Sequence, residues 1–176
     1  MTGVALKAHP TDLVLSRAGV RFMGRVFPCT IGRGGVGAAK REGDGATPAG
    51  VHRIVAVLYR PDRLAPPNGW ARPIRPGDLW SDASGAAGYN SLVRVPYPHS
   101  AETMRRGDRL YDLVLVTDWN WPEAAPGRGS AIFLHRWRRP GFATEGCVAF
   151  APAHLRWIAE RIVPGTRLIV PPGMVG

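Results

Sequence analysis

Residues 131–163 read AIFLHRWRRPGFATEGCVAFAPAHLRWIAERIV, and this stretch carries the clearest structural pattern in the chain. Residues 131–136 are mostly aliphatic and aromatic, which predicts a β-strand that carries His135 near its end. Pro152 suits the first turn of a helix, and Pro164 with Gly165 would end that helix after Val163. Apolar residues at helical spacing give the helix one apolar face: Leu155, Ile158, Ala159 and Ile162. Between the strand and the helix lies Cys147, directly after a glycine.

The rest of the chain predicts short strands separated by turns. Glycine and proline, 22 and 17 residues of 176, together exceed a fifth of the chain, which is typical of many turns. A second, shorter helix is predicted over residues 101–106, with Ser100 as its N-cap and Gly107 as its end. Further strands are predicted at residues 12–16, 19–28, 51–60, 110–119 and 166–170. We expect one mainly β domain over residues 1–176, with one or two helices.

Composition narrows the class of protein. Apolar residues make up 45% and charged residues 20%, which is typical of a globular chain, and no apolar run is long enough to span a membrane. Residues 1–10 lack the apolar stretch of a secretory signal. The net charge of +10 favours an anionic partner, although an arginine-rich coding bias also explains it. The arginines are scattered and no basic helix or RNA-binding motif is present, so nucleic acid is not the expected partner.

Two other motifs have readings that we reject. Residues 32–37, GRGGVG, spell a dinucleotide-binding fingerprint, but too few residues follow for the helix that such a site needs. A zinc site from His135, Cys147 and His154 would have no standard spacing and no fourth ligand. We therefore expect neither a metal nor another cofactor.

The pairing of His135 with Cys147 is the chemical signal of the sequence. An imidazole near a thiol can take its proton and so make the thiolate, which is the nucleophile. Gly146 lets a substrate come close to the backbone, and the amides of Gly146 and Cys147 could hold a developing oxyanion. For a lone histidine and a lone cysteine, packing is the better explanation. With Gly146-Cys147 following His135 at this spacing, packing and catalysis explain the residues equally well. Cys29 is expected to pack in the core, without a disulfide to Cys147.

Several motifs resemble the YkuD-type L,D-transpeptidases. In that family a histidine precedes a Ser/Thr-x-Gly-Cys box, as His135 precedes residues 144–147 here. Residues 43–50, GDGATPAG, are similar to the Gly-Asp-x-x-Thr-Pro-x-Gly stretch of the family, and Lys40 precedes them. Segments that resemble a bacterial branch of the family are residues 80–82, 89–90, 100–104, 110–112 and 126–130. The resemblance covers roughly residues 12–170.

The resemblance implies a β-sandwich or barrel-like catalytic domain that cross-links peptidoglycan. Cys147 would form a thioester with an L-centred residue of a stem peptide, and an acceptor amine would resolve it. His135 would take the thiol proton, and the carbonyl of Arg136 would orient it, with Gly146 beside the nucleophile. Carboxypeptidase action and D-amino-acid exchange are implied as side activities. The expected substrate-binding residues are Thr144, Glu145, Trp119 and Asn120.

Two positions depart from the usual family pattern. Many members carry His or Arg where Glu145 stands, and a polar residue where Ala149 stands. A carboxylate close to the thiol would raise the thiol pKa, so Glu145 is expected to point away or to bind a substrate cation.

Two alternative functions remain open at this point. A sortase-like thiol transpeptidase also places His before Cys, but with a longer separation and an Arg on the following strand, whereas Arg156 falls on the predicted helix. A catalytically silent domain that binds the cell wall would also suit the charge. The favoured enzyme would be a monomer in the periplasm or cell envelope, bind peptidoglycan stem peptides, lack an integral membrane segment, and serve peptidoglycan biosynthesis, cell-wall organisation and cell shape.

Overall fold

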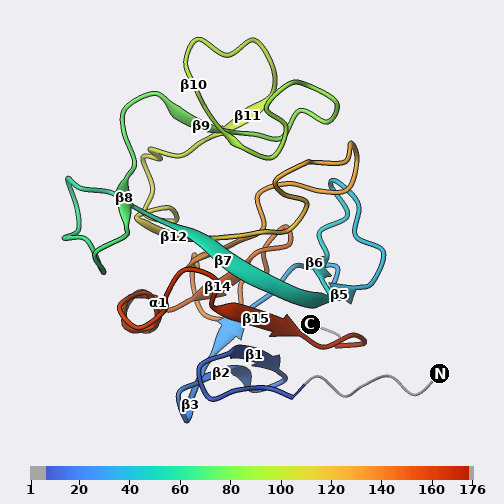
Figure 1. Cartoon of the computed structure of the whole chain (residues 1–176), viewed down its shortest axis with the longest axis vertical. Helices are drawn as coiled ribbons and strands as arrows, with labels where there is room; N and C mark the ends of the chain where they lie inside the picture. The colour runs from blue at the N-terminus through green and yellow to red at the C-terminus, as the bar shows by residue number, and fades with distance from the viewer. Residues whose placement is uncertain (1–6, 175–176) are drawn as a thin grey trace.

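The computed structural model describes residues 7–174, which form a mainly β fold with one α-helix, α1 (Pro152–Ala159) (Figure 1). The prediction of a mainly β fold whose main helix follows Cys147 is therefore confirmed. The prediction about a signal at residues 1–10 falls partly outside the described residues. The strands are β1 (Leu13–Ser16), β2 (Gly19–Phe22), β3 (Arg25–Phe27), β4 (Cys29–Thr30), β5 (Val36–Gly37), β6 (Thr47–Pro48), β7 (Gly50–Tyr59), β8 (Arg72–Pro73), β9 (Asp78–Ser81), β10 (Leu92–Arg94), β11 (Ala101–Thr103), β12 (Leu113–Thr117), β13 (Phe133–Arg136), β14 (Val148–Phe150) and β15 (Arg167–Val170).

The main sheet is nearly closed and barrel-like, as expected. Its hydrogen-bonded path runs β3-β2-β1-β15-β7-β12-β13-β14-β4, and β8 pairs with β7 beside this path. β3 ends at Phe27 and β4 begins at Cys29, so the two ends of the path are separated by one residue of chain. This short connection keeps the two edge strands, β3 and β4, close together, so the sheet is nearly closed and its edges are protected.

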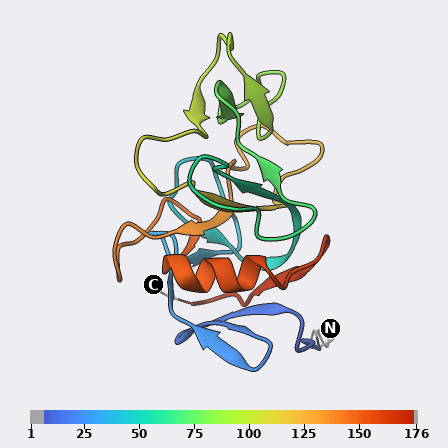
Figure 2. The same ribbon diagram turned by 90° about the vertical axis from the view of Figure 1, so that its left-hand side faces the viewer.

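The main core lies between the sheet and α1. Leu155, Ile158 and Ala159 of α1 are buried against apolar residues of the sheet, including Leu115 and Leu134. Figure 2 shows α1 lying between the β1–β3 strands and the rest of the molecule. The predicted apolar face of the helix is the face that packs here.

Side chains alternate across β13, and this alternation creates two different environments. Leu134 belongs to the main core, whereas Phe133 belongs to a second apolar cluster that also contains Cys147. His135 follows Phe133 on the side of the second cluster, because it lies two residues further along the same strand. Arg136 lies on the side of α1.

A small three-stranded sheet covers the second cluster. Its strands run in the order β10-β9-β11, at the top of Figure 1. Trp80 of β9 packs edge-on against Phe133, with 4.9 Å between the ring centroids. This contact ties the small sheet to the strand that carries His135.

The prediction of a helix over residues 101–106, N-capped by Ser100, is wrong. Residues 101–103 form β11, in which Glu102 pairs with Trp80 of β9, and Met104 is fully buried. A six-residue helix has little stability of its own, so strand pairing and burial of Met104 decide the conformation. The carbonyl of Ser100 accepts a hydrogen bond from the Asp82 amide instead.

Several predicted elements are longer than the observed ones. The strand predicted at residues 19–28 is broken by a turn in which Met23 and Gly24 both have positive φ. The strand predicted at residues 110–119 is ordered as β12 only over Leu113–Thr117. The helix ends at Ala159, with Glu160 as its C-cap, four residues before the expected end.

Within residues 7–174, the helix is too short to cross a membrane. The two cysteines, Cys29 and Cys147, are both free thiols, as predicted. Cys29 packs against the main core from β4, and burial raises its pKa to about 12. That environment suits an inert structural thiol.

Candidate active site

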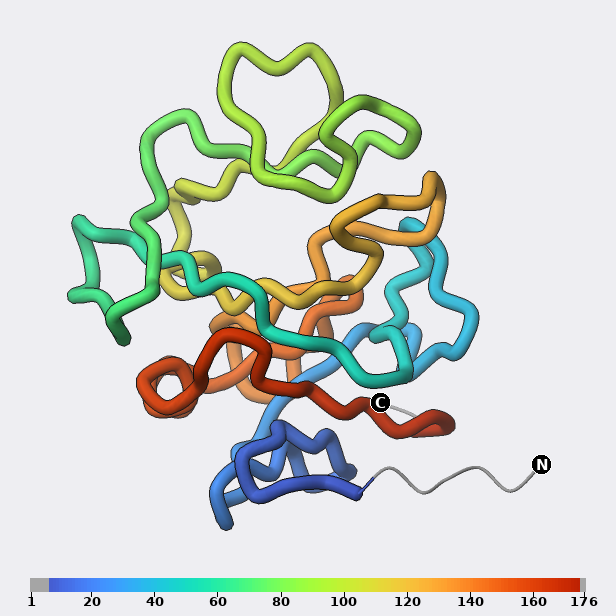
Figure 3. The backbone as a smooth tube through the Cα atoms, viewed as in Figure 1, coloured from blue at the N-terminus to red at the C-terminus, as the bar shows by residue number. Residues whose placement is uncertain are grey.

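A cavity of about 700 Å³ contains both Cys147 and His135. This volume lies in the range of small-molecule and peptide pockets. One wall comes from two loops, residues 38–46 and 120–131, which lie side by side in Figure 3 and are joined by a hydrogen bond from the Glu42 amide to the Gly127 carbonyl. The other walls are formed by β13, by residues 102–111 and by residues 137–147.

Parallel pairing of β13 and β14 explains how the two residues meet. His135 lies opposite Ala149, and Cys147 directly precedes β14. Parallel neighbours cannot be joined by a tight turn, so the chain needs a longer connection between the two residues. Residues 137–147 provide it and also form the rim of the cavity.

The Cys147 thiol is buried and neutral at rest. Its S–H donates to the carbonyl of Ala131 (3.1 Å), and the Phe133 amide donates to Sγ (3.4 Å). Burial raises the thiol pKa to about 12. No hydrogen bond joins Cys147 to His135, although both residues are among those described. The thiol must therefore turn from Ala131 before it can pass its proton to the imidazole.

His135 is held in one tautomer. Its Nδ1 lies 2.6 Å from the carbonyl oxygen of Arg136. A carbonyl only accepts, so Nδ1 carries the proton and Nε2 of the neutral ring has a free lone pair. Burial lowers the pKa of His135 to about 4, with a smaller contribution from the positive charge of Arg106. The ring is therefore a neutral base throughout the ordinary pH range.

Thr144 closes the turn that presents the thiol. Its hydroxyl donates to the carbonyl of Cys147 (2.6 Å) and accepts from the amide of Gly146 (3.1 Å). The Gly146 amide is thus already engaged. The Cys147 amide has no partner among residues 7–174 and is the remaining donor for an oxyanion.

Thr47 supports the same turn from the other side. Its hydroxyl donates to the carbonyl of Gly146 (2.8 Å) and accepts from the amide of Gly32 (2.9 Å). A β-carbon on Gly146 would lie 2.8 Å from the carbonyl oxygen of Ala46, and Gly146 has φ of +139°. Only glycine fits at this position.

The glycine-rich stretch at residues 32–37 has a structural role. Gly32 packs against the backbones of Gly45 and Gly146, which leaves no room for a β-carbon at Gly32. This stretch leads into β5, which pairs with β6, and no helix follows. The resemblance to a dinucleotide-binding motif thus reflects close packing of Gly32 under the turn that carries Cys147.

Glu145 lies at the exposed rim, paired with Arg33. Both of its carboxylate oxygens accept from Arg33 Nε, at 3.0 and 2.9 Å. Their side chains are 76% and 57% exposed, so this ion pair contributes little to stability. The pair neutralises the carboxylate two residues before Cys147.

Trp119 and Asn120 lie outside this cavity. They line a separate hollow of about 330 Å³ together with His52 and Arg128. Their carbonyls accept from Asn90 Nδ2, and Asn90 Oδ1 accepts from the amide of Ala131. They are therefore connected to Cys147 through the residue whose carbonyl binds the thiol.

Tyr111 and Glu102 are site residues that the sequence analysis did not select. The Tyr111 hydroxyl donates to Glu102 Oε2 (2.6 Å), and its ring meets that of His135 edge-on at 5.5 Å. Burial raises the pKa of both side chains. Arg106 lies over the Tyr111 ring and is paired with Asp108. The family-like segments 100–104 and 110–112 were the signal for these residues.

Lys40 is a further lining residue. Its ammonium is almost fully buried and donates to Asp44 Oδ1 and to the carbonyl of Arg41, both at 2.6 Å. Asp44 also accepts from the amides of Arg41 and Ala46. Burial raises the pKa of Asp44, but the Lys40 ammonium and these two amides together lower it further than burial raises it. These bonds fix the loop that carries Thr47.

Residues 7–174 contain no group of three or more His, Cys, Asp or Glu side chains placed to hold a metal ion. His154 packs against the ring of Phe27, with 5.4 Å between the ring centroids, and does not line the cavity that contains Cys147 and His135.

A barrel-like β domain with this cavity fits the class of transpeptidase catalytic domains. The family model of the L,D-transpeptidase catalytic domain matches residues 10–170. The chain therefore belongs to the YkuD family, whose members act on the peptidoglycan of the cell wall. No curated protein and no solved structure shows a match to the chain.

Proposed function

We propose that this protein is a cysteine L,D-transpeptidase that cross-links peptidoglycan stem peptides. The observation that carries the proposal is the shared cavity of Cys147 and His135, in which Arg136 holds the imidazole with Nε2 available. A neutral base and a buried thiol are the two groups needed for acyl transfer through a thioester.

The first step is acylation of the thiol. The donor stem enters the cavity, Cys147 turns from Ala131, and the thiol proton passes to His135 Nε2. Sγ attacks the carbonyl of the L-centred residue, and the C–S bond forms. The C–N bond to the following D-residue then breaks, and His135 returns the proton to the departing amine.

The negative oxygen formed during this attack needs a donor. The amide of Cys147 supplies one hydrogen bond, because its hydrogen is not otherwise engaged within residues 7–174. A donor already oriented before the reaction stabilises the transition state without rearrangement. The Gly146 amide serves the turn instead.

The second step releases the product. An amine of a second stem loses a proton to His135 and attacks the thioester, so that a C–N bond forms and the C–S bond breaks. The proton then returns from His135 to the thiolate. Water in place of this amine gives carboxypeptidase activity, and a free D-amino acid gives exchange.

The four expected substrate-binding residues divide into two groups. Thr144 and Glu145 line the cavity and contact the substrate, with Glu145 at the rim beside Arg33. Trp119 and Asn120 act from outside the cavity, by holding Asn90 and through it the backbone of Ala131.

The test is incubation with purified stem peptides, followed by mass spectrometry of both protein and peptides. We expect a thioester adduct on Cys147 and a cross-linked product. Cys147→Ala removes both, and His135→Ala removes the product. Cys29→Ala is the matched control, because it removes the other thiol, which lies outside the cavity. Product formation by Cys147→Ala would show that the proposal is wrong.

The same proposal assigns the protein to the periplasm or cell envelope. It also implies a monomer that consists of a single catalytic domain over residues 1–176. Its substrate lies there, and its roles are peptidoglycan biosynthesis, cell-wall organisation and cell shape. Fractionation with an antibody to the protein tests the location, and sedimentation tests the oligomeric state. Binding to sacculi without any product from the wild type would favour a silent binding domain instead.

A further inference from the structure

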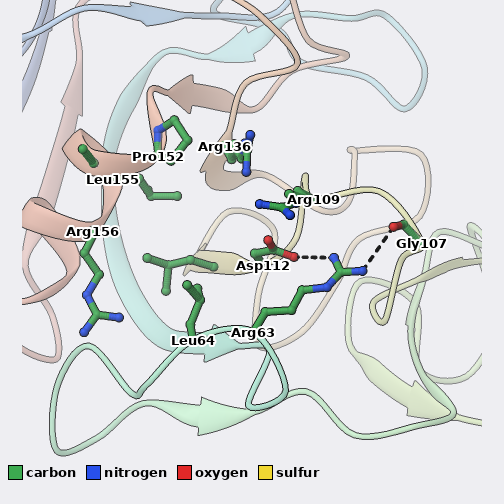
Figure 4. A pocket seen from close by; sticks show the side chains of 11 residues that line it. Arg63, Leu64, Gly107, Arg109, Asp112, Arg136, Pro152, Leu155 and Arg156 are labelled. Carbon is green, nitrogen blue, oxygen red and sulfur yellow. Dashed lines mark hydrogen bonds and ion pairs between the residues drawn. The ribbon is translucent and has the colours of Figure 1, made fainter.

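A second cavity, of about 720 Å³, lies on the α1 side of β13 and contains four arginines (Figure 4). They come from separate segments: Arg63 follows β7, Arg109 precedes β12, Arg136 ends β13 and Arg156 lies on α1. The apolar lining includes Leu64, Leu113 and Leu155.

The positive charge of this cavity is only partly balanced. Asp112 is the acidic residue among its lining, and it accepts from Arg63 at 2.7 Å. Arg156 is paired with Glu160, at 2.7 Å. Arg109 and Arg136 have no carboxylate partner within residues 7–174. The lining thus holds four arginines and one carboxylate, and the charges of Arg109 and Arg136 are not neutralised within residues 7–174.

The start of α1 adds to this positive potential. Pro152 and Ala153 line the cavity, and Ala151 makes no side-chain capping bond. The first turn contains no acidic residue that would neutralise the helix dipole. The helix dipole and the arginines therefore both favour a negatively charged ligand.

We infer that this cavity binds a ligand with closely spaced oxyanion groups, either phosphate or carboxylate. Guanidinium groups bind both in a two-pronged manner, and arginine is the better choice where such geometry matters. The apolar floor would contact the carbon framework of the ligand. The site is distinct from the catalytic cavity and does not depend on the proposed transpeptidase chemistry.

The ligand would lie next to the residue that orients the catalytic base. The Arg136 side chain lines this cavity, while its carbonyl holds Nδ1 of His135. Residues 106–112 also separate the two cavities: Tyr111 lines the catalytic one, and Arg109 and Asp112 line the second. A ligand here is placed to contact both of the elements that support His135.

Calorimetric titration with inorganic pyrophosphate and with citrate tests the proposal. Salt at about 150 mM suppresses weak surface attraction. We expect the wild type to bind at least one probe, and the double variant R109Q/R136Q to bind it about tenfold or more weakly, because two charge-assisted contacts are lost. The better probe identifies the source, phosphate or carboxylate.

The matched control is R21Q/R75Q, which removes the same charge from two exposed arginines outside the cavities described. Binding by this control should stay within about twofold of the wild type, since net charge contributes little at this salt. Amide resonances of Ala153 and Gly107 should shift on binding.

The inference would be overturned if neither probe binds the wild type, or if both double variants lose affinity equally. Thermal melting checks that each variant is folded, and repeating the titration on Cys147→Ala separates the site from the catalytic function.

Discussion

At the level of single residues, the candidate nucleophile and base are both kept neutral. Burial raises the pKa of Cys147 to about 12 and lowers that of His135 to about 4. The resting Cys147–His135 pair is therefore uncharged, and in the proposed mechanism the proton moves from the thiol to the imidazole only during acylation. Papain-like thiol sites solve the same problem differently, by forming the ion pair in advance.

The lowered pKa of His135 predicts an unusual pH profile. The base works in its neutral form, which persists as pH falls until the pKa is reached. We expect the acid limb of kcat/KM for stem peptides near pH 4 rather than near 6.5, the ordinary value. Steady-state assays between pH 3.5 and 8 measure it. An acid limb above pH 6 contradicts the assigned environment.

The pH dependence of folding stability makes a control necessary for that experiment. A histidine with a lowered pKa takes up its proton more readily when unfolded, so the fold loses stability as pH falls from 6.5 towards 4. Circular dichroism at each pH shows whether lost activity reflects titration or unfolding. Only points with native spectra count towards the acid limb.

The raised thiol pKa predicts slow alkylation. Relative to the ordinary value of 9.0, a pKa of about 12 lowers the thiolate fraction at neutral pH about 1,000-fold. We expect iodoacetamide to modify Cys147 at least about 100-fold more slowly in the folded protein than in urea. Peptide mass mapping gives both rates. Equal rates in the two conditions would contradict this environment.

At the level of elements, the local sequence pattern correctly predicted the helix α1 but wrongly predicted a helix over residues 101–106. α1 was predictable because its apolar face and its first-turn proline agree, whereas the end predicted from Pro164 and Gly165 lies four residues beyond the observed end at Ala159. Residues 101–106 were not, because a cap and a glycine define a helix only when no strand competes for the segment. β9, twenty residues earlier in the chain, decides that competition.

The residues around the turn that carries Cys147 also divide into those that local sequence predicts and those that it does not. Cys147, Gly146 and His135 were predicted as candidate site residues because their order along the chain is itself a motif, and the structure places Cys147 and His135 in one cavity. Tyr111, Glu102 and Lys40 lie in or beside family-like segments, but their place in the cavity could not be predicted from those segments, because it depends on strand register and on loops that meet only after folding.

Substitution at Gly146 tests the turn. Gly146→Ala combines positive φ with a contact of 2.8 Å to the Ala46 carbonyl. We expect kcat/KM to fall by about 100-fold or more, because a small displacement of the thiol is enough for such a loss. Gly141→Ala is the control, since its φ is also positive but its β-carbon would meet open space. Similar losses in both variants would show that φ alone is responsible.

At the scale of the whole molecule, β15 joins the first and middle parts of the sheet. It pairs in parallel with β1 and antiparallel with β7. Leu168, at the centre of this junction, is fully buried in the main core. Residues far apart in the chain thus form adjacent strands, which is why the sheet order could not be read from the sequence.

Leu168→Ala should destabilise the whole fold. Removing this side chain leaves a cavity in the core, which costs about 2–5 kcal/mol in comparable sites. Urea unfolding, followed by fluorescence, measures the free energy of unfolding. Val163→Ala is the control, because Val163 is 63% exposed; we expect it to change that free energy by less than about 0.5 kcal/mol.

The position of β15 between β1 and β7 also bears on the protein's synthesis. Until residue 170 has left the ribosome, the strand that joins these two is missing, and the sheet stays open. Thr47, which supports the turn that carries Cys147, lies three residues before the start of β7, so we expect its support to come with the completed sheet. A nascent chain, or one truncated before β15, would therefore carry Cys147 without the completed sheet, and we expect such a chain to lack the proposed acyl-transfer activity.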